Sequence, residues 1–200
     1  MLEKLLQIDK ELILFLNGLH SPFFDVLVWW ITTIWFWLPV LALVLWFMWK
    51  HYKKKLGLIG AFLALSLVFS DQLSGIIKDK TARFRPTHNT EINHQLHLHA
   101  FKNGEFYTGG NYGFVSAHAA NSTALTFLLI YFFKPINRRA RWLFLFFPLI
   151  FSYTRIYLGV HYPLDIAGGI FVGLLCGLFT LWLYQLSEKN IRVNDDVSEK

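Results

Sequence analysis

Thr154-Arg155-Ile156-Tyr157-Leu158-Gly159-Val160-His161-Tyr162-Pro163-Leu164-Asp165 is the stretch that predicts the organisation of the whole chain. It places an arginine, a histidine and a carboxylate between two long apolar runs. An ionisable group inside or beside a membrane span is energetically costly, so its presence there indicates a functional site. Pro163 suits the first position of a following helix, where its missing N–H costs nothing. Asp165 would then lie in the first turn, where its carboxylate can hold one nitrogen of the His161 ring and leave the other free.

The same residues also have an ordinary structural interpretation. Arg155 would be an anchor at the membrane interface, and His161 would cap the helix that begins at Pro163. This stretch alone leaves both interpretations open, so the polar residues elsewhere in the chain must decide between them.

Composition indicates an integral membrane protein. The chain has 200 residues, of which 54% are hydrophobic and 18% aromatic, and several apolar runs reach the roughly 20 residues that cross a bilayer. The formal charge of +6 could suggest nucleic acid, but the basic residues cluster between apolar runs, which is typical of membrane topology. No nucleic-acid partner is therefore expected. The single cysteine, Cys176, excludes an intrachain disulfide.

The predicted fold is all-α, an integral membrane helical bundle with five transmembrane helices and an N-terminal amphipathic helix. Residues 1–20 carry leucines at helical spacing with charges between them, which is typical of a helix in the membrane interface, although a short first span is the alternative. The transmembrane domain is predicted at 21–187, with spans at 24–49, 56–77, 113–133, 142–157 and 163–186. A charged cytoplasmic tail, disordered at its end, is expected at 188–200.

The basic residues also predict how the bundle is oriented. Two short turns, at 50–55 and 134–141, carry most of the lysines and arginines between spans, which places both in the cytoplasm. The C-terminus is then cytoplasmic and the N-terminus lies outside. The loop at 78–112 and the segment at 158–162 meet on the outer face, which brings three polar clusters to one membrane surface.

The first cluster is Lys78 with Arg85 and Pro86, and Lys80 and Arg83 lie inside it. The second runs from Gly113 to Ser122 and contains Ser116 and His118. Span-end lysines and arginines are often simple snorkelling anchors, but guanidinium and ammonium groups also form anion clamps. Ser116 is a good N-cap for the third span, which would present free N–H groups to an anion. The alternative interpretation of the second cluster is a polar helix start that contains a histidine without a function.

Together with the third cluster, these residues suit phosphoryl transfer. Two histidines, a carboxylate, several cations and a helix N-terminus would share one face of the membrane. One histidine can attack phosphorus, the other can protonate the leaving oxygen, and the cations can stabilise the charge on the phosphoryl oxygens.

The three clusters resemble the signature of the type-2 phosphatidic acid phosphatase family, whose active-site pattern is shared with vanadium haloperoxidases. That signature is Lys-x6-Arg-Pro, then Pro-Ser-Gly-His, then Ser-Arg-x5-His-x3-Asp. The first motif is complete in this chain. The second reads Val115-Ser116-Ala117-His118, and the third has Thr154 in place of serine. The resemblance runs from about residue 56 to residue 186.

The resemblance implies a role for each matching residue. His161 would be the nucleophile, Asp165 would raise its basicity and fix its tautomer, and His118 would be the general acid. The phosphate would be held by Lys78, Arg85, Arg155, Ser116 and the N–H of Ala117. No metal or other cofactor is implied. The family motif has glycine where this chain has Ala117. Glycine is the usual residue where backbone approaches a ligand closely, so alanine at this position would hold the phosphate less closely.

The outer loop contains His94, His97 and His99 with Glu91, but no second ligand cluster accompanies them, so no metal site is predicted there. Asn103-Gly104 is a strong turn signal, and a small β-hairpin over the active site is expected.

The sequence thus predicts a membrane lipid phosphatase working through a phosphohistidine on the outer face of a bacterial cytoplasmic membrane. Undecaprenyl diphosphate is the favoured substrate, with lipid A, phosphatidic acid and phosphatidylglycerol phosphate as alternatives. An anion or lipid transporter would explain the cations but not the paired histidines, and an inactive scaffold is the third possibility. The expected partners are the lipid phosphate and membrane lipids, and nothing in the sequence specifies an oligomeric state.

Overall fold

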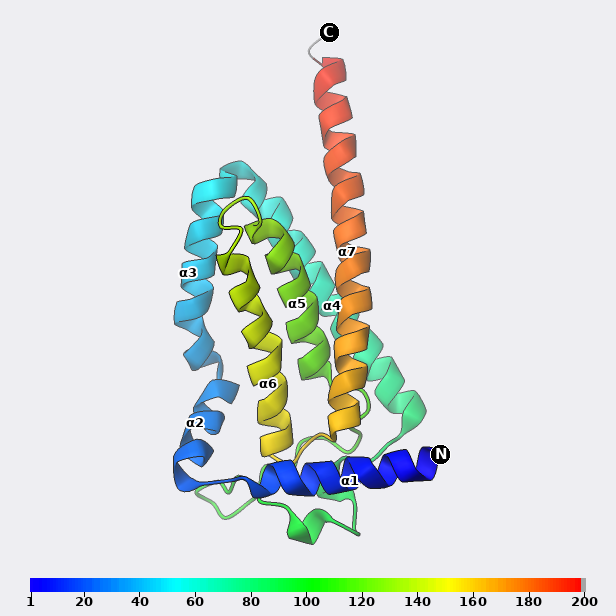
Figure 1. The fold of residues 1–200 in the computed structure, drawn as a ribbon. Helices are drawn as coiled ribbons and strands as arrows, with labels where there is room; N and C mark the ends of the chain where they lie inside the picture. Colours follow the sequence, from blue (N-terminus) through cyan, green and yellow to red (C-terminus); the bar gives the residue numbers. More distant parts are fainter. Residues whose placement is uncertain (199–200) are drawn as a thin grey trace.

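The protein is a bundle of long helices with one helix lying across its end (Figure 1). The structure, a computed structural model, describes the backbone of residues 1–198 and the side chains of residues 1–190. Within them the α-helices are α1 (Leu2–Gly18), α2 (Pro22–Thr32), α3 (Ile34–Tyr52), α4 (Leu56–Thr81), α5 (Ala117–Phe133), α6 (Phe146–Tyr157) and α7 (Pro163–Ser198). Short 3-10 segments occur at Lys53–Lys55, Pro86–His88, Asn93–Gln95 and Ala140–Leu145.

Helices α4, α5 and α7 form the centre of the bundle, and the α5–α7 contact is the most extensive. Glycines on α7 permit the close approach of α5 and α7. A Cβ atom added at Gly173 would lie 2.8 Å from the Cβ atom of Thr123 and still closer to the carbonyl of Ala120. A Cβ atom at Gly169 would lie 2.9 Å from that of Ala119. Small residues at a membrane helix interface allow this close backbone approach.

This packing predicts opposite effects for two glycine-to-alanine changes. Gly173→Ala should destabilise the fold by about 1–3 kcal/mol, as overpacking usually does. Gly60→Ala, on α4 with no atom within 4 Å of the added Cβ, should be neutral or stabilising because alanine is the better helix former. Thermal unfolding in detergent measures both variants. Equal behaviour of the two would contradict the close α5–α7 contact.

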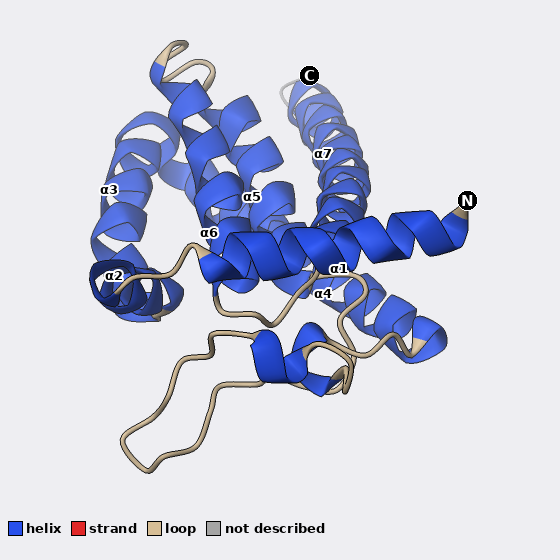
Figure 2. Ribbon diagram, turned by 60° about the horizontal axis from the view of Figure 1, so that its bottom comes forward, coloured by secondary structure: helices blue, strands red, loops and turns tan. Residues whose placement is uncertain are grey.

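Helix α1 lies across the end of the bundle and bends by 109° into α2 (Figures 1 and 2). Its packed face contains Asp9, Ile13 and Asn17, while leucines of the predicted apolar stripe, such as Leu2 and Leu12, are exposed. The polar residues face inward because they have partners there: Asp9 accepts from Leu164 N–H, and Asn17 donates to the carbonyl of Tyr157. Leucines of α1 such as Leu2 and Leu12 therefore face away from the protein, whereas Ile13 packs into its core.

The predicted first span at 24–49 is wrong as one continuous helix. It is broken at Thr33, which has extended backbone (φ −85°, ψ 148°) between α2 and α3. The hydroxyls of Thr32 and Thr33 donate to the carbonyls of Trp29 and Trp30, and these bonds satisfy acceptors at the end of α2. Serine and threonine hydroxyls compete with helical hydrogen bonds in this way, so the pair marks a helix end.

Among the residues that the structure describes, two helical stretches are able to cross a membrane by length and apolar composition. They are Ile34–Thr81, which contains α3 and α4, and Pro163–Asn190; the bent pair α1–α2 would be a third. The protein is thus a helical membrane protein, but this criterion does not establish the predicted five spans. Helix α7 continues to Ser198, beyond the predicted span end at 186, whereas the predicted disorder at the end of the tail lies outside the described residues.

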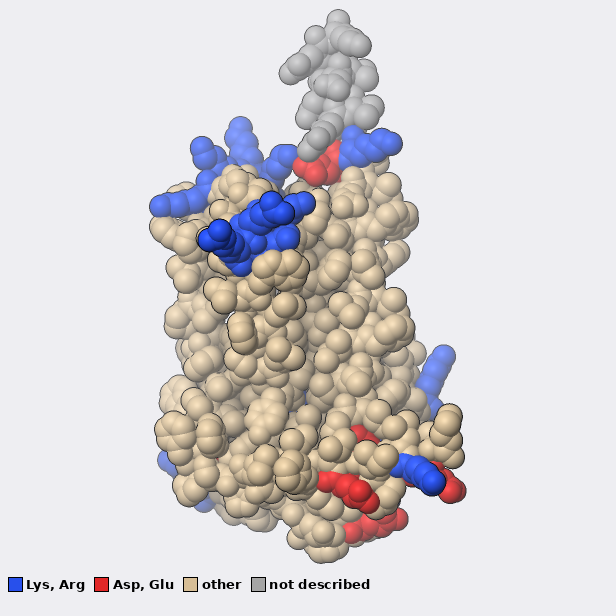
Figure 3. Space-filling model, viewed as in Figure 1, with Lys and Arg blue, Asp and Glu red and all other residues tan. Residues whose placement is uncertain are grey.

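The two ends of the bundle differ in charge. Lysines and arginines gather at the end that holds the α3–α4 and α5–α6 connections, whereas acidic side chains gather near α1 and the loop beside it (Figure 3). Residues 82–116 form that loop, next to α1 (Figure 2). It turns at Asn103-Gly104 with an isolated antiparallel bridge between Ala100 and Phe106, not with extended strands.

Candidate active site

The centre of the site is a buried histidine–aspartate pair at the start of α7. His161 and Asp165 are 1% and 0% exposed, and Nδ1 of His161 lies 3.3 Å from Oδ2 of Asp165. Because α7 begins at Pro163, Asp165 falls in its first turn, and its Oδ2 also accepts from the N–H of Tyr162 at 3.0 Å. The sequence prediction placed these two side chains in this relation.

Arg85 fixes which nitrogen of His161 carries the proton. Its Nη1 lies 3.1 Å from Nε2 of His161, and a guanidinium can only donate hydrogen bonds. Nε2 must therefore be the acceptor, which leaves the proton on Nδ1, toward Asp165. Burial first, and then the positive charges of Arg85, Lys78 and Arg155, hold the pKa of His161 well below its usual range. The ring is consequently neutral at neutral pH, with a lone pair on Nε2.

Arg85 is itself held in place by backbone. Its Nε donates to the carbonyl of Tyr112 at 3.1 Å and its Nη1 to the carbonyl of Val160 at 3.2 Å. Two glycines leave the room that it needs: a Cβ atom at Gly109 would lie 2.8 Å from Nη1, and one at Gly113 would lie 3.3 Å from Cγ. Gly109 also has φ +70°, a conformation that glycine adopts without strain.

A second arginine, Arg83, joins the site to α1. Its two terminal nitrogens donate to Asp165 Oδ1 at 2.8 Å and to Asp9 Oδ2 at 2.6 Å. Its guanidinium also lies over the Tyr162 ring, 4.3 Å from the centroid. Breaking a buried charge pair of this kind is strongly destabilising because it leaves an uncompensated charge. Arg83 therefore couples the position of Asp165 to that of the helix lying across the bundle.

The second motif forms the start of α5. Ser116 is fully buried and caps the helix by accepting from the N–H of Ala119 at 3.4 Å, as the sequence predicted. Ala117 and His118 are thus the first residues of α5, where backbone N–H groups have no partner within the helix. His118 is exposed, and its ring lies 5.5 Å from that of Phe151.

Arg155 has one guanidinium nitrogen without a hydrogen-bond partner. It is 3% exposed, its Nε donates to the hydroxyl of Thr154 at 3.1 Å, and its Nη1 donates to the hydroxyl of Tyr107 at 3.3 Å. Its Nη2 is buried without a hydrogen-bond partner. A buried cationic donor without a partner is costly, so it indicates a place where an anion binds.

The predicted cationic and imidazole side chains meet in one place. Both His118 and His161 lie within electrostatic range of Lys78, Arg85 and Arg155, and of each other. Two imidazoles, three cations and a helix N-terminus can bind a phosphoryl group and move protons to and from it.

Sequence reasoning missed Asp9 and Tyr107, and it assigned no role to Arg83 beyond membership of the first cluster. A signal for Asp9 was present: Asp9, Ile13 and Asn17 recur every four residues, so two polar side chains share a helix face with Ile13. Tyr107 gives no such signal, because its contact with Arg155 depends on how the outer loop folds back.

Fold and site together define a helical membrane enzyme that acts on phosphate groups. The PAP2 superfamily model matches residues 59–189, and the chain belongs to this superfamily of hydrolases of phosphate esters.

Two curated relatives resemble most of the chain. A lipid A 4'-phosphatase of Bacteroides thetaiotaomicron is 39% identical over 189 residues, covering 92% of this chain and 78% of the relative. A lipid A 4'-phosphatase of Porphyromonas gingivalis is 34% identical, and the match covers 92% of this chain and 75% of the relative. An undecaprenyl-diphosphatase of Sulfolobus acidocaldarius is a weaker match, 29% identical over 140 residues, covering 68% and 58%.

Among solved structures, the PAP2-type phosphatidylglycerolphosphate phosphatase of Bacillus subtilis shares this fold. The TM-score is 0.65 at 18% identity, covering 91% of this chain and 87% of the other. The family match and the two lipid A 4'-phosphatase relatives, and not this structural likeness, show that the chain is a membrane lipid phosphatase of PAP2 type.

Proposed function

We propose that the protein removes a phosphate from lipid A on the outer face of the cytoplasmic membrane, through a phosphohistidine at His161. The observation that carries the chemistry is the His161–Asp165 pair, whose Nε2 lone pair faces Arg85 among the other cations. The substrate is inferred from the two lipid A 4'-phosphatases that resemble 92% of the chain. Undecaprenyl diphosphate, which the sequence favoured, becomes the alternative because its hydrolase is the weaker match.

In the first step, the lone pair on Nε2 of His161 attacks phosphorus and a P–N bond forms. The P–O bond to the lipid breaks, and the leaving oxygen takes its proton from His118. Asp165 stabilises the positive charge that develops on the ring through the Nδ1 proton. The phosphate brings negative charge beside His118, which favours its protonated form before attack.

The cations act on the phosphoryl oxygens. Nη2 of Arg155 is free to donate a hydrogen bond to the phosphate. Nη1 of Arg85 would donate to a phosphate oxygen in place of Nε2 of His161, which frees this nitrogen to attack. Lys78 adds a compact charge. The first N–H groups of α5 provide further donors, and such fixed donors stabilise the transition state without reorganising.

In the second step, water attacks the phosphohistidine and gives its proton to His118. The P–N bond breaks, its electrons return to Nε2, and inorganic phosphate leaves. The products are the lipid alcohol and phosphate. No resident metal takes part in either step.

A panel of lipid phosphates tests the substrate directly. Purified protein in detergent with excess chelator should release phosphate from lipid A faster than from undecaprenyl diphosphate or phosphatidic acid, as measured by kcat/KM. A preference for undecaprenyl diphosphate would overturn the choice of substrate but not the phosphatase chemistry. Transport of lipid in vesicles without phosphate release would favour a transporter instead.

The site also predicts a pH dependence. Because the pKa of His161 in the folded protein is well below the ordinary value of about 6.5, the imidazole stays neutral as pH falls through that value. The acidic limb of kcat/KM for the free enzyme should therefore lie below about pH 6.5. Below the same pH the unfolded chain binds a proton that folded His161 does not, so the contribution of His161 to stability falls on acidification. An acidic limb above pH 6.5 would contradict the buried, neutral nucleophile.

A further inference from the structure

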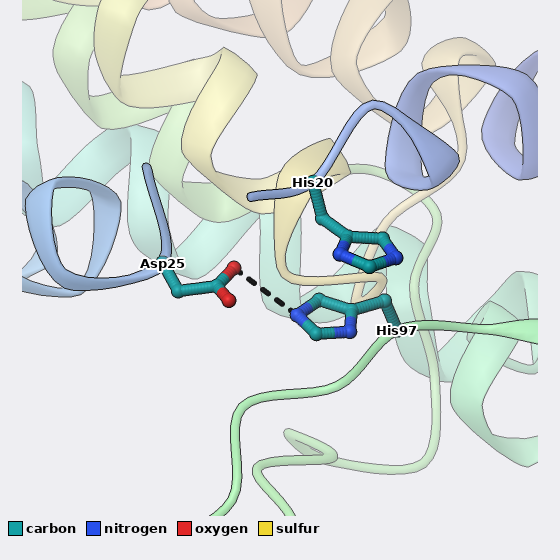
Figure 4. A group of neighbouring side chains, drawn as sticks. All are labelled: His20, Asp25 and His97. Carbon is teal, nitrogen blue, oxygen red and sulfur yellow. Dashed lines mark hydrogen bonds and ion pairs between the residues drawn. The ribbon is translucent and has the colours of Figure 1, made fainter. Parts of the chain in front are cut away.

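A second cluster of ligand-type side chains lies outside the active site. His20 and Asp25 come from the corner between α1 and α2, and His97 comes from the outer loop (Figure 4). Their ligand atoms all lie within 4.8 Å of one another, and no other described residues form such a group. His20 and Asp25 also precede residues 59–189, the part that matches the PAP2 superfamily.

The geometry of the cluster is close to that of a metal site. Nε2 of His97 lies 3.1 Å from Oδ1 of Asp25, and the rings of His20 and His97 are stacked with centroids 3.7 Å apart and planes 5° from parallel. Both rings present a nitrogen on the side that faces Asp25 (Figure 4). Tetrahedral zinc holds its ligand atoms about 3.3 Å apart, given Zn–N distances of about 2.0–2.1 Å. Parallel stacked rings do not direct their lone pairs at one point, so the exposed His20 ring has to rotate away from His97 before all three side chains can bind one ion.

Outer-shell contacts hold two of the three ligands in place. Asn17 fixes His97 through its backbone, donating to the carbonyl at 2.9 Å and accepting from the N–H at 2.7 Å. The Tyr157 hydroxyl donates to Asp25 Oδ1 at 2.7 Å, which orients the carboxylate. Metal sites characteristically orient their ligands through such second contacts. A cavity of about 270 Å³, lined by Asp25 and His97 but not by His20, lies beside these two ligands.

We propose that His20, Asp25 and His97 bind Zn²⁺ and so tether the outer loop to the corner between α1 and α2. Two imidazoles and one carboxylate suit this ion, with water in the fourth position. The tether matters because the outer loop also supplies Tyr107, which contacts Arg155. The ion would act on the loop and not on the phosphate, because none of its ligands belongs to the phosphate-binding set.

Replacement of His20 is the most specific test of the proposed zinc site. The structure records no hydrogen bond or ion pair for this exposed side chain, only the stacking on His97, so His20→Ala should fold normally. His94 is the matched control: it is an exposed outer-loop histidine outside the cluster.

The experiment is a titration of chelator-stripped, full-length protein in detergent with Zn²⁺, in competition with a chromophoric chelator. Wild type and His94→Ala should bind one equivalent tightly. His20→Ala should lose more affinity than the roughly 10–100-fold that loss of an outer-shell partner costs, and Tyr157→Phe should lose about 10–100-fold. Zn²⁺ should also raise the Tm of wild type and of His94→Ala, but not of His20→Ala.

Three results would overturn the proposal. One is folded wild type that binds no Zn²⁺. Another is equal affinity in His20→Ala and wild type, which would leave His97 and Asp25 as a simple ion pair. The third is loss of binding in His94→Ala alone, which would move the site to the outer-loop histidines. A cooperative thermal transition shows independently that each variant is folded, and phosphate release is measured separately, so failure here is distinct from failure of the proposed lipid A activity.

Discussion

His161→Gln should abolish phosphate release, with kcat falling by about a million-fold, the scale on which removal of a covalent nucleophile acts. The reason is that Nε2 of His161 is the atom that bonds to phosphorus, and no neighbouring group can replace it. Glutamine is chosen because His161 is 1% exposed and an alanine there would leave a cavity. The measurement is release of inorganic phosphate from lipid A by the purified variant.

Two controls make this result specific. His51→Ala removes an exposed histidine beside the α3–α4 turn, at the other end of the bundle, and should retain full activity. Thermal unfolding of His161→Gln should show a cooperative transition, which separates loss of chemistry from loss of fold. Substantial turnover by folded His161→Gln would show that the nucleophile lies elsewhere.

His118→Ala should lower kcat for lipid A by about 100- to 10,000-fold, the usual contribution of a general acid–base residue. The loss arises because a sugar alkoxide leaves poorly without a proton. A nitrophenyl phosphate has a leaving group that departs unprotonated, so its P–O bond should still break in this variant. Because His118 also activates water, the variant should then stall as phosphoenzyme. We expect a burst of one equivalent of nitrophenol per site, followed by slow turnover.

The burst distinguishes a general acid from a structural residue. Because His118 is exposed at the first turn of α5, its replacement by alanine should leave the fold intact. Equal losses on lipid A and on nitrophenyl phosphate, with no burst, would contradict the assigned role. His161→Gln serves as the control, since it should show neither burst nor turnover on either substrate.

Local relations in the site were predictable from the sequence. The His161–Asp165 contact follows from four-residue spacing at a helix that proline begins, and the Ser116 cap follows from its place before α5. The number of apolar spans and the positions of the basic turns predict that these residues lie near Lys78 and Arg85. That the predicted side chains gather in one region agrees with the outer-face assignment, which itself remains a prediction.

Long-range partners were not predictable in the same way. Arg83 lies inside the first motif, but its bridge from Asp165 to Asp9 joins residues that are far apart in the chain, and no local pattern pairs them. The break at Thr33 was missed because its flanks are uniformly apolar, so hydropathy is continuous across it. The outer-loop histidines are neighbours in sequence, but that does not predict where each side chain turns in the fold. In the fold His97 turns to His20 and Asp25, whereas His99 stacks on Trp29 at 3.7 Å.

Mapping the phosphoenzyme tests the central claim most directly. The His118→Ala variant is mixed with radiolabelled nitrophenyl phosphate, quenched in alkali during the burst and digested, and the labelled peptide is sequenced by mass spectrometry. The account predicts close to one phosphoryl group per chain, bound to His161. Label on any other side chain, or a nitrophenol burst that leaves no label on the protein, would contradict it.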